Sequence, residues 1–142
     1  MIVELFSHNV DSILEIYASD FKDGWNREQL LSAFSSGRFV SFAVQKNDKI
    51  VSVITCSISF EEADLEGIVT LKEHKNKGYA KALIEHLITF LKEKKVEKLF
   101  LEVREGNLSA INLYKKVGFN QISIRKKYYQ NGENALIMVK EI

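Results

Sequence analysis

The sequence predicts an α/β (α+β) fold in which helices flank a mixed, mostly antiparallel sheet. Three observations indicate this fold. The chain has 142 residues, of which 46% are hydrophobic and 27% charged, as in a globular protein with one core. Segments rich in β-branched residues alternate with amphipathic segments, without repeats or a low-complexity linker. A strand–helix–strand order between residues 64 and 103 adds one parallel pair. We therefore expect a single domain over 1–142.

The chain is expected to begin with a strand, followed by two short helices. Apolar side chains recur on one side of residues 10–20 and again on one side of residues 27–36, with the spacing of amphipathic helices. The segment FKDGWN separates the two helices, and its Asp, Gly and Asn residues are typical of a loop.

Three strands are expected to follow these helices. The segments FVSFAVQ (39–45) and IVSVITCSI (50–58) are rich in β-branched and aromatic residues. Between them, Asn47-Asp48 is typical of a hairpin turn. Residues 64–71 form the third strand of this group.

The remaining elements alternate between helix and strand. Residues 78–95 show the clearest helical pattern, because their apolar residues follow the i, i+3, i+4, i+7 spacing of one buried stripe. LFLEV at 99–103 is the next expected strand. A helix over 108–117 then ends before Gly118, a residue suited to a helix C-terminus. The two last expected strands are 119–128 and 135–141.

Charge, cysteine and histidine content exclude several classes of function. The formal net charge of +1 argues against general nucleic-acid binding. The single cysteine, Cys56, excludes an intramolecular disulfide and is expected in the core. No metal is expected, because His8, His74 and His86 lack the spacing of metal ligands. No apolar run approaches the length of about 18 residues that a membrane span needs. We expect a cytoplasmic protein without membrane or nucleic-acid partners.

The stretch KEHKNKGYAKAL (72–83) places basic side chains at the start of a predicted helix. Three interpretations are open: a phosphate site, a nucleic-acid patch, or a solvated helix start without function. Free N–H groups and the positive end of the dipole suit an anion at a helix N-terminus, and Gly78 lets a ligand approach the backbone closely. Lys75, Lys77 and Lys81 add positive charge. The glycine-rich motifs of dinucleotide-binding and nucleotide-triphosphatase loops are both absent.

Polar residues between 101 and 119 form a second candidate cluster. Strand alternation places Glu102 on the face opposite Leu101 and Val103, where its carboxylate faces either solvent or a cleft. Asn107 suits the N-cap of the following helix. Tyr114 lies on the apolar side of that helix, so periodicity alone favours a core aromatic over an acid. Each of these residues therefore also has a purely structural interpretation.

Taken together, these segments resemble the GNAT superfamily of N-acetyltransferases. The shared features are a strand, a basic G-x-A turn, an amphipathic helix, LEVR, and N-x-x-A-x-x-L-Y-x-x-x-G-F at 107–119. From 64 to 138 the chain is similar to the ribosomal-protein-alanine N-acetyltransferases (RimI type), through the motifs Arg125-x-x-Tyr128-Tyr129 and Glu133-x-Ala135-x-x-Met138. FKDGWN resembles the F-x-W segment of the family, so the resemblance covers nearly the whole chain.

The resemblance implies a sheet whose central parallel strands splay apart, and acetyl-CoA as the co-substrate. The backbone of Ile68, Val69 and Thr70 is then expected to pair with pantetheine, which Asn107 also binds. By the same resemblance, Glu102 is the general base and Tyr114 the general acid. The pyrophosphate is expected on the turn formed by Lys75, Asn76, Lys77, Gly78, Tyr79, Ala80 and Lys81.

Several positions depart from the family pattern. Lys75 stands where Gln or Arg is usual, Ala80 replaces the second Gly, and Leu71-Lys72 replaces Asp-Pro. These changes spare the backbone donors, so the expectation of a cofactor site is unchanged. Asn134 stands for a common Asp and bears on the acceptor groove.

The expected reaction is direct transfer of an acetyl group to a primary amine, without a covalent acyl-enzyme. An α-amine has a pKa of about 8, so Glu102, directly or through water, would take its excess proton. Tyr114 would return a proton to the thiolate, and a strand N–H near Val69 would polarise the carbonyl.

The identity of the acceptor substrate is what the sequence indicates least directly. By resemblance it is the N-terminal α-amine of a ribosomal protein, bound between the 21–26 loop with Trp25 and the last strand pair with Tyr128, Tyr129 and Glu133. A structural alternative is that these aromatic residues only close the sheet. The functional alternatives are a small amine, such as a polyamine or aminoglycoside, and a non-catalytic acyl-CoA sensor, against which the joint presence of acid and base argues. A monomer or weak homodimer is expected.

Overall fold

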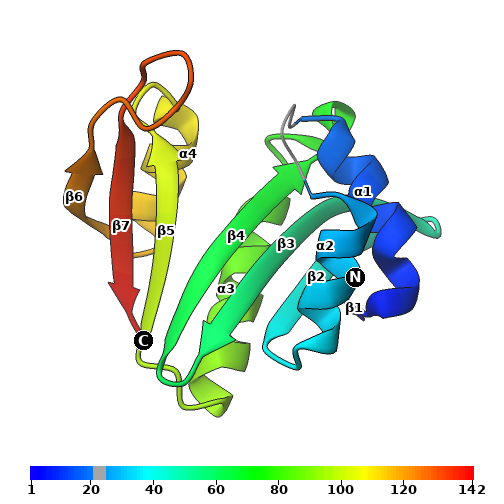
Figure 1. Cartoon of the computed structure of the whole chain (residues 1–142). Helices are drawn as coiled ribbons and strands as arrows, with labels where there is room; N and C mark the ends of the chain where they lie inside the picture. The colour runs from blue at the N-terminus through cyan, green and yellow to red at the C-terminus, as the bar shows by residue number, and fades with distance from the viewer. Residues whose placement is uncertain (21–24) are drawn as a thin grey trace.

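The computed structural model describes residues 1–20 and 25–142, which form a seven-stranded sheet with helices on both faces (Figure 1). The strand order is β1-β2-β3-β4-β5-β7-β6, and β4–β5 is the parallel pair within an otherwise antiparallel sheet. This arrangement confirms the predicted fold class. The strands are β1 (Ile2–Leu5), β2 (Phe39–Lys46), β3 (Lys49–Ser59), β4 (Glu62–Thr70), β5 (Lys98–Arg104), β6 (Asn120–Arg125) and β7 (Ala135–Glu141); the helices are α1 (Val10–Ala18), α2 (Arg27–Ser35), α3 (Tyr79–Glu93) and α4 (Leu108–Lys116).

Strands β2, β3 and β4 follow one another through tight turns. Asn47 and Asp48 have φ angles of 51° and 63°, and positive values at both central residues are those of a two-residue hairpin turn. The predicted turn is thus confirmed. Further along, Thr55 pairs with Gly67 whereas Cys56 pairs with Leu65, which leaves one extra residue in β4. Such a bulge bends a strand locally, here between Leu65 and Gly67, before the C-terminal end of β4.

The parallel strands β4 and β5 are paired only where they begin. Glu62 lies opposite Lys98, and the pairing ends two positions later, where Asp64 lies opposite Phe100. Beyond this point both strands continue without pairing to each other, and Figure 1 shows them separating in a V. We call this feature the strand divergence; its two edges are residues 65–70 of β4 and 101–104 of β5.

Helical layers bury the two faces of the sheet. Helices α1 and α2 cover β1 to β4 on one face, with a core that includes Ile13, Leu30 and Val53. Helices α3 and α4 cover the other face, where their apolar residues pack with Leu101 and Val103 of β5. The exposed face of β5, β7 and β6 therefore lies on the same side of the sheet as α1 and α2 (Figure 1).

Every predicted helix and strand is present, and the ends differ by at most three residues. The largest difference is at β6, which was expected to reach residue 128 but ends at Arg125, because Lys127 has a φ of 51° that turns the chain out of the sheet. Two short 3₁₀ turns, Ser7–Asn9 and Lys72–His74, were not predicted. In the described parts of the chain, no helix is long and apolar enough to cross a membrane.

Candidate active site

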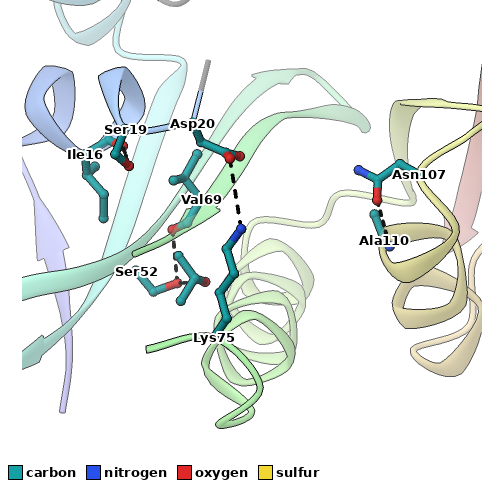
Figure 2. A network of polar contacts seen from close by, with 9 residues as sticks. Ile16, Ser19, Asp20, Ser52, Val69, Lys75, Asn107 and Ala110 are labelled. Carbon is teal, nitrogen blue, oxygen red and sulfur yellow. Dashed lines mark hydrogen bonds and ion pairs between the residues drawn. The ribbon is translucent and has the colours of Figure 1, made fainter. Parts of the chain in front are cut away.

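The C-terminal part of β4, residues 65–70, is hydrogen-bonded to a neighbouring strand on one side only, to β3. Val53 of β3 lies opposite Val69, and the Ser52 hydroxyl donates to the Val69 carbonyl over 3.2 Å (Figure 2). The Val69 side chain is buried in the α1–α2 core, which fixes the position of this segment. The opposite backbone edge of residues 68–70 faces the strand divergence. A ligand with amide groups can bond to this edge as a neighbouring strand would.

The basic turn leads from β4 into α3 and has the backbone of an anion site. Gly78 precedes the helix with a φ of 82°, and a Cβ placed on it would meet no atom within 4 Å. Asn76 also has a positive φ, of 63°. These two residues turn the chain so that α3 begins at Tyr79, with its first N–H groups left for an external acceptor. Lys75 is anchored near α1, since its Nζ lies 4.0 Å from Asp20 Oδ1 (Figure 2).

Asn107 caps α4. Its side-chain Oδ1 accepts a hydrogen bond from the backbone N–H of Ala110 at 3.2 Å, as expected for an N-cap (Figure 2). This bond confirms the structural interpretation of Asn107. It is also compatible with a ligand role, because the cap uses the carbonyl oxygen and leaves the NH₂ group as a donor.

Tyr114 lies in the core between the sheet and the helices. Its side chain is only 6% exposed, and its ring packs edge-on against Phe119, with centroids 5.8 Å apart. Burial raises the pKa of Tyr114 to about 12, so the hydroxyl stays protonated at physiological pH. The residue is therefore a core aromatic, as periodicity indicated, and also a neutral hydrogen donor, as an acid must be.

Glu102 projects from the exposed face of β5. Leu101 and Val103 are buried on the other face, which confirms the predicted alternation. The carboxylate of Glu102 pairs with Arg125, whose Nη1 lies 3.2 Å from Oε1. Burial raises the pKa of Asp64 on β4, and the charge of Glu102 raises it further. Two carboxylates thus face each other across the base of the strand divergence.

Tyr17 is a feature of the site that sequence reasoning missed. Its hydroxyl shares a hydrogen bond of 2.6 Å with the Thr55 hydroxyl, and a Cβ on Gly67 would lie 2.8 Å from its Oη. Burial raises the pKa of Tyr17, and the nearby Tyr114 adds to this effect. Helix α1 therefore places the Tyr17 hydroxyl against the backbone of β4 at Gly67. A glycine inside a predicted strand was the available signal, because it often marks close approach of another group.

The segment between β6 and β7 joins two tyrosines to the exposed face of β5. The rings of Tyr128 and Tyr129 pack edge-on with centroids 5.2 Å apart, and Tyr128 is 50% exposed. The Arg104 guanidinium lies 4.0 Å from the centroid of the Tyr129 ring, and its Nη1 lies 3.5 Å from Glu133 Oε1. Both tyrosines, Glu133 and Glu102 therefore gather on one side of the sheet.

Asn134 fastens this segment to the end of β5. Its Oδ1 accepts a hydrogen bond from the Lys127 N–H at 2.9 Å, and its Nδ2 donates to Glu105 at 2.8 Å. An amide both donates and accepts here, whereas an ionised Asp can only accept. The departure at position 134 is therefore accommodated by Glu105.

Two other residues have structural roles. Trp25 packs edge-on against Phe39 of β2, with centroids 5.5 Å apart, and is partly buried against the α1–α2 core. This contact favours the structural alternative for Trp25. Of the expected 21–26 groove loop, residues 21–24 lie outside the described residues. Cys56 is fully buried, as expected, and burial raises the pKa of its thiol. Among the described residues, no group of three His, Cys, Asp or Glu side chains is arranged to hold a metal ion.

The diverging parallel pair and the basic turn before α3 are joined by a direct indication of the class of protein. The chain belongs to the acetyltransferase (GNAT) family, whose model matches residues 10–119, and it is accordingly an acyltransferase. This finding confirms the family identified from the sequence motifs.

Comparison with individual proteins narrows the similarity to one group within this family. The ribosomal protein bS18-alanine N-acetyltransferase of Haemophilus influenzae is 38% identical over 140 positions, covering 89% of this chain and 95% of the relative. The enzyme of the same name from Escherichia coli K12 is 31% identical, covering 94% and 99%. The crystal structure of the ribosomal-protein-S18-alanine N-acetyltransferase from Escherichia coli matches with a TM-score of 0.92 at 31% identity, covering 100% of this chain and 93% of that chain. A chain of the NatC complex bound to Gag peptide and CoA, 18% identical with a TM-score of 0.87, has the same fold.

Proposed function

We propose that this enzyme transfers the acetyl group of acetyl-CoA to a protein N-terminus, and that the acceptor is the N-terminal alanine of ribosomal protein bS18. The names of relatives with 31% to 38% identity over nearly their whole length support this acceptor. We further propose that residues 1–142 act as one N-acetyltransferase domain, which the continuous sheet supports.

The placement of Glu102 and Tyr114 on opposite faces of the sheet supports transfer between two substrates. Glu102 lies on the exposed face of β5, whereas Tyr114 packs in the α3–α4 layer with Leu101 and Val103. Beyond Asp64 and Phe100 the strands β4 and β5 are no longer paired to each other. A thioester on the Tyr114 side and an amine on the Glu102 side would then meet between the strands.

Residues of the basic turn fit the phosphates of the cofactor. The backbone N–H groups at the start of α3 would bind the pyrophosphate, with Lys75, Lys77 and Lys81 adding charge. The open space over Gly78 supports this fit. Lys81 also lines a surface pocket of about 390 Å³ with Lys116, Lys140 and one carboxylate, Glu85, so a phosphate that extends along α3 would meet a net positive charge. Residues Ile68 to Thr70 and the NH₂ group of Asn107 would bond to pantetheine.

The residues of the site and solvent account for each proton in the reaction. Bound acetyl-CoA supplies an electrophilic carbonyl and a thiolate leaving group. Glu102 takes the excess proton of the α-ammonium, directly or through water, which frees the nitrogen lone pair for attack. A backbone N–H near Val69 donates to the carbonyl oxygen as charge develops there. As the C–N bond forms, the nitrogen would lose its second proton to solvent, and as the C–S bond breaks, Tyr114 would give its proton to sulfur and regain one from solvent.

Mass spectrometry of three acceptor types tests this function. The enzyme is incubated with acetyl-CoA and a peptide that begins with Ala, the same peptide blocked at its N-terminus but containing internal Lys, or spermidine. We expect acetylation of the free α-amine, and far slower reaction of the other two. Acetyl groups found chiefly on Lys side chains or on spermidine would replace the N-terminal assignment by a small-amine or lysine acceptor. Cofactor binding without transfer to any acceptor would identify a sensor.

A further inference from the structure

Arg125 reaches across a neighbouring strand to contact the proposed base. Arg125 ends β6, and β7 lies between β6 and β5. In the register, Arg125 lies opposite Ala135, which on its other side lies opposite Arg104, two residues beyond Glu102. The Arg125 Nη1 ends 3.2 Å from Glu102 Oε1.

The groups around Glu102 include one acidic residue, one tyrosine and two arginines, and only one of these arginines pairs with it. Asp64 faces it from β4, and Tyr129 interacts with it from the segment between β6 and β7. Arg104, the nearest cation on its own strand, is already paired with Glu133 over 3.5 Å and stacked on Tyr129. Among the described side chains, Arg125 is therefore the cation in contact with Glu102.

The ion pair between Arg125 and Glu102 is weak enough for another cation to replace Arg125. The side chains of Arg125 and Glu102 are 56% and 36% exposed, and ion pairs with this exposure contribute little to stability. Arg125 has a second contact available, because its guanidinium carbon lies 5.5 Å from the ring centroid of Tyr128. A cation over an aromatic face is stabilised there. Arg125 can therefore leave Glu102 without losing all of its contacts.

We propose that Arg125 holds the place of the acceptor's α-ammonium on Glu102 and is displaced when the acceptor binds. The inference rests on the proposed function, in which an α-ammonium arrives at Glu102. An α-amine with a pKa of about 8 is mostly cationic at neutral pH, so the exchange replaces one cation by another. An N-terminus without a charge cannot make this replacement. Arg125 is thus a positioning residue that pairs with Glu102 until a charged N-terminus takes its place, at the cost of one exposed ion pair.

A thermodynamic cycle tests the exchange. Calorimetry gives the dissociation constants of a peptide beginning with Ala and of its N-acetylated form, in the presence of CoA, for the parent and for Arg125→Met. We expect the free peptide to bind roughly threefold to fivefold tighter to the variant, the equivalent of one exposed ion pair. The acetylated peptide should be unaffected. The ratio of the two constants therefore changes, which a general structural effect of the substitution would not produce.

Three further variants serve as controls. Arg125→Lys keeps a cation and should return the ratio to near the parental value. Arg104→Met removes a comparable guanidinium that pairs with Glu133 instead, and should change the ratio much less than Arg125→Met does. In the background of Glu102→Gln, Arg125→Met should have no effect on the ratio, because neither cation has a carboxylate to bind.

The outcomes separate this inference from the proposed function. If the parent acetylates the Ala peptide but the ratio is the same in parent and Arg125→Met, only the role of Arg125 is wrong. The same holds if the change persists in the Glu102→Gln background. If the parent forms no acetylated peptide, the proposed function and the inference that depends on it both fail.

Discussion

The hydroxyl of Tyr114 combines two properties that usually exclude each other in a proton donor. It is buried enough for its pKa to reach about 12, so it is protonated whenever the thiolate forms. An acid this weak is, however, poorly matched to neutral pH. We therefore expect Tyr114 to act late, when negative charge has already accumulated on sulfur.

Conservative substitutions at Glu102 and Tyr114 test the two roles. Each of Glu102→Gln and Tyr114→Phe should lower kcat by roughly 10²–10⁴, with Tyr114→Phe toward the lower end, and leave cofactor affinity within a few-fold. Higher pH should partly restore Glu102→Gln, since solvent then deprotonates the amine. Steady-state kinetics measures both. Parental turnover in Tyr114→Phe would leave the residue with a packing role only.

Because Tyr114 is buried in its neutral form, the free energy of unfolding should fall at alkaline pH. Its pKa is about 10 in the unfolded chain and about 12 in the folded one, so folding favours the neutral form. This contribution is fully present below pH 10 and is lost as the pH rises through 12. The free energy of unfolding, from urea titrations below and above pH 10, should fall more steeply in the parent than in Tyr114→Phe. Equal slopes would mean that Tyr114 ionises as freely in the folded state as in the unfolded chain.

At the scale of residues, local rules predicted what depends on near neighbours. Strand alternation placed Glu102 on the exposed face, and capping preference placed Asn107 at the start of α4, as the structure confirms. The roles of Glu102, Asn107 and Tyr114 in catalysis and binding remain predictions. Tyr17 was missed because its hydrogen-bond partner, Thr55, lies 38 residues away. Its neighbour Gly67 lies opposite Thr55 on the next strand, β4, and is equally distant in the sequence.

The turn before α3 gives the element-scale prediction. A valine at position 78 must adopt a φ of 82°, which is strained for a residue with a Cβ, and its side chain would cover the N–H groups of the helix. Gly78→Val should nearly abolish acetyl-CoA binding measured by calorimetry. Lys75→Ala should weaken it only a few-fold, because backbone amides are the main donors.

Gly37 provides the matched control for backbone strain. It has a φ of 72°, and a Cβ there also meets no atom within 4 Å, but it precedes β2 rather than a helix. Gly37→Val should therefore lose stability to a similar extent and keep the affinity for acetyl-CoA. Unchanged affinity in Gly78→Val would rule out the turn as the pyrophosphate site.

At the scale of elements, the periodicity of apolar residues predicted which helices and strands exist better than it predicted where they end. The apolar stripe of α3 and the alternation of β5 identified both elements to within two residues. The early end of β6 depends on the positive φ of Lys127, which no residue preference indicated. The parallel pairing of β4 with β5 followed from their connection. The short length of that pairing did not, because it depends on how the two halves of the sheet pack on different helices; only the family resemblance implied it.

For the whole molecule, cofactor binding should raise thermal stability. A ligand that binds only the folded state at about 100 times its Kd adds about 2.7 kcal/mol, which is on the order of 10 °C in Tm for a chain of this size. Thermal unfolding with and without acetyl-CoA measures the shift. Gly37→Val should retain it and Gly78→Val should lose most of it. A parent protein without any shift at saturating acetyl-CoA would contradict the proposed cofactor site.

The strand divergence gives this sheet open margins in its interior. A sheet ordinarily exposes unpaired backbone only along its first and last strands, here β1 and β6. In this molecule the segments 65–70 and 101–104 are unpaired toward each other as well. Unpaired margins recruit other extended chains, so the ligand-free enzyme should self-associate more readily than the loaded one. Amide hydrogens along these segments should also exchange quickly until a bound cofactor takes the place of the missing strand.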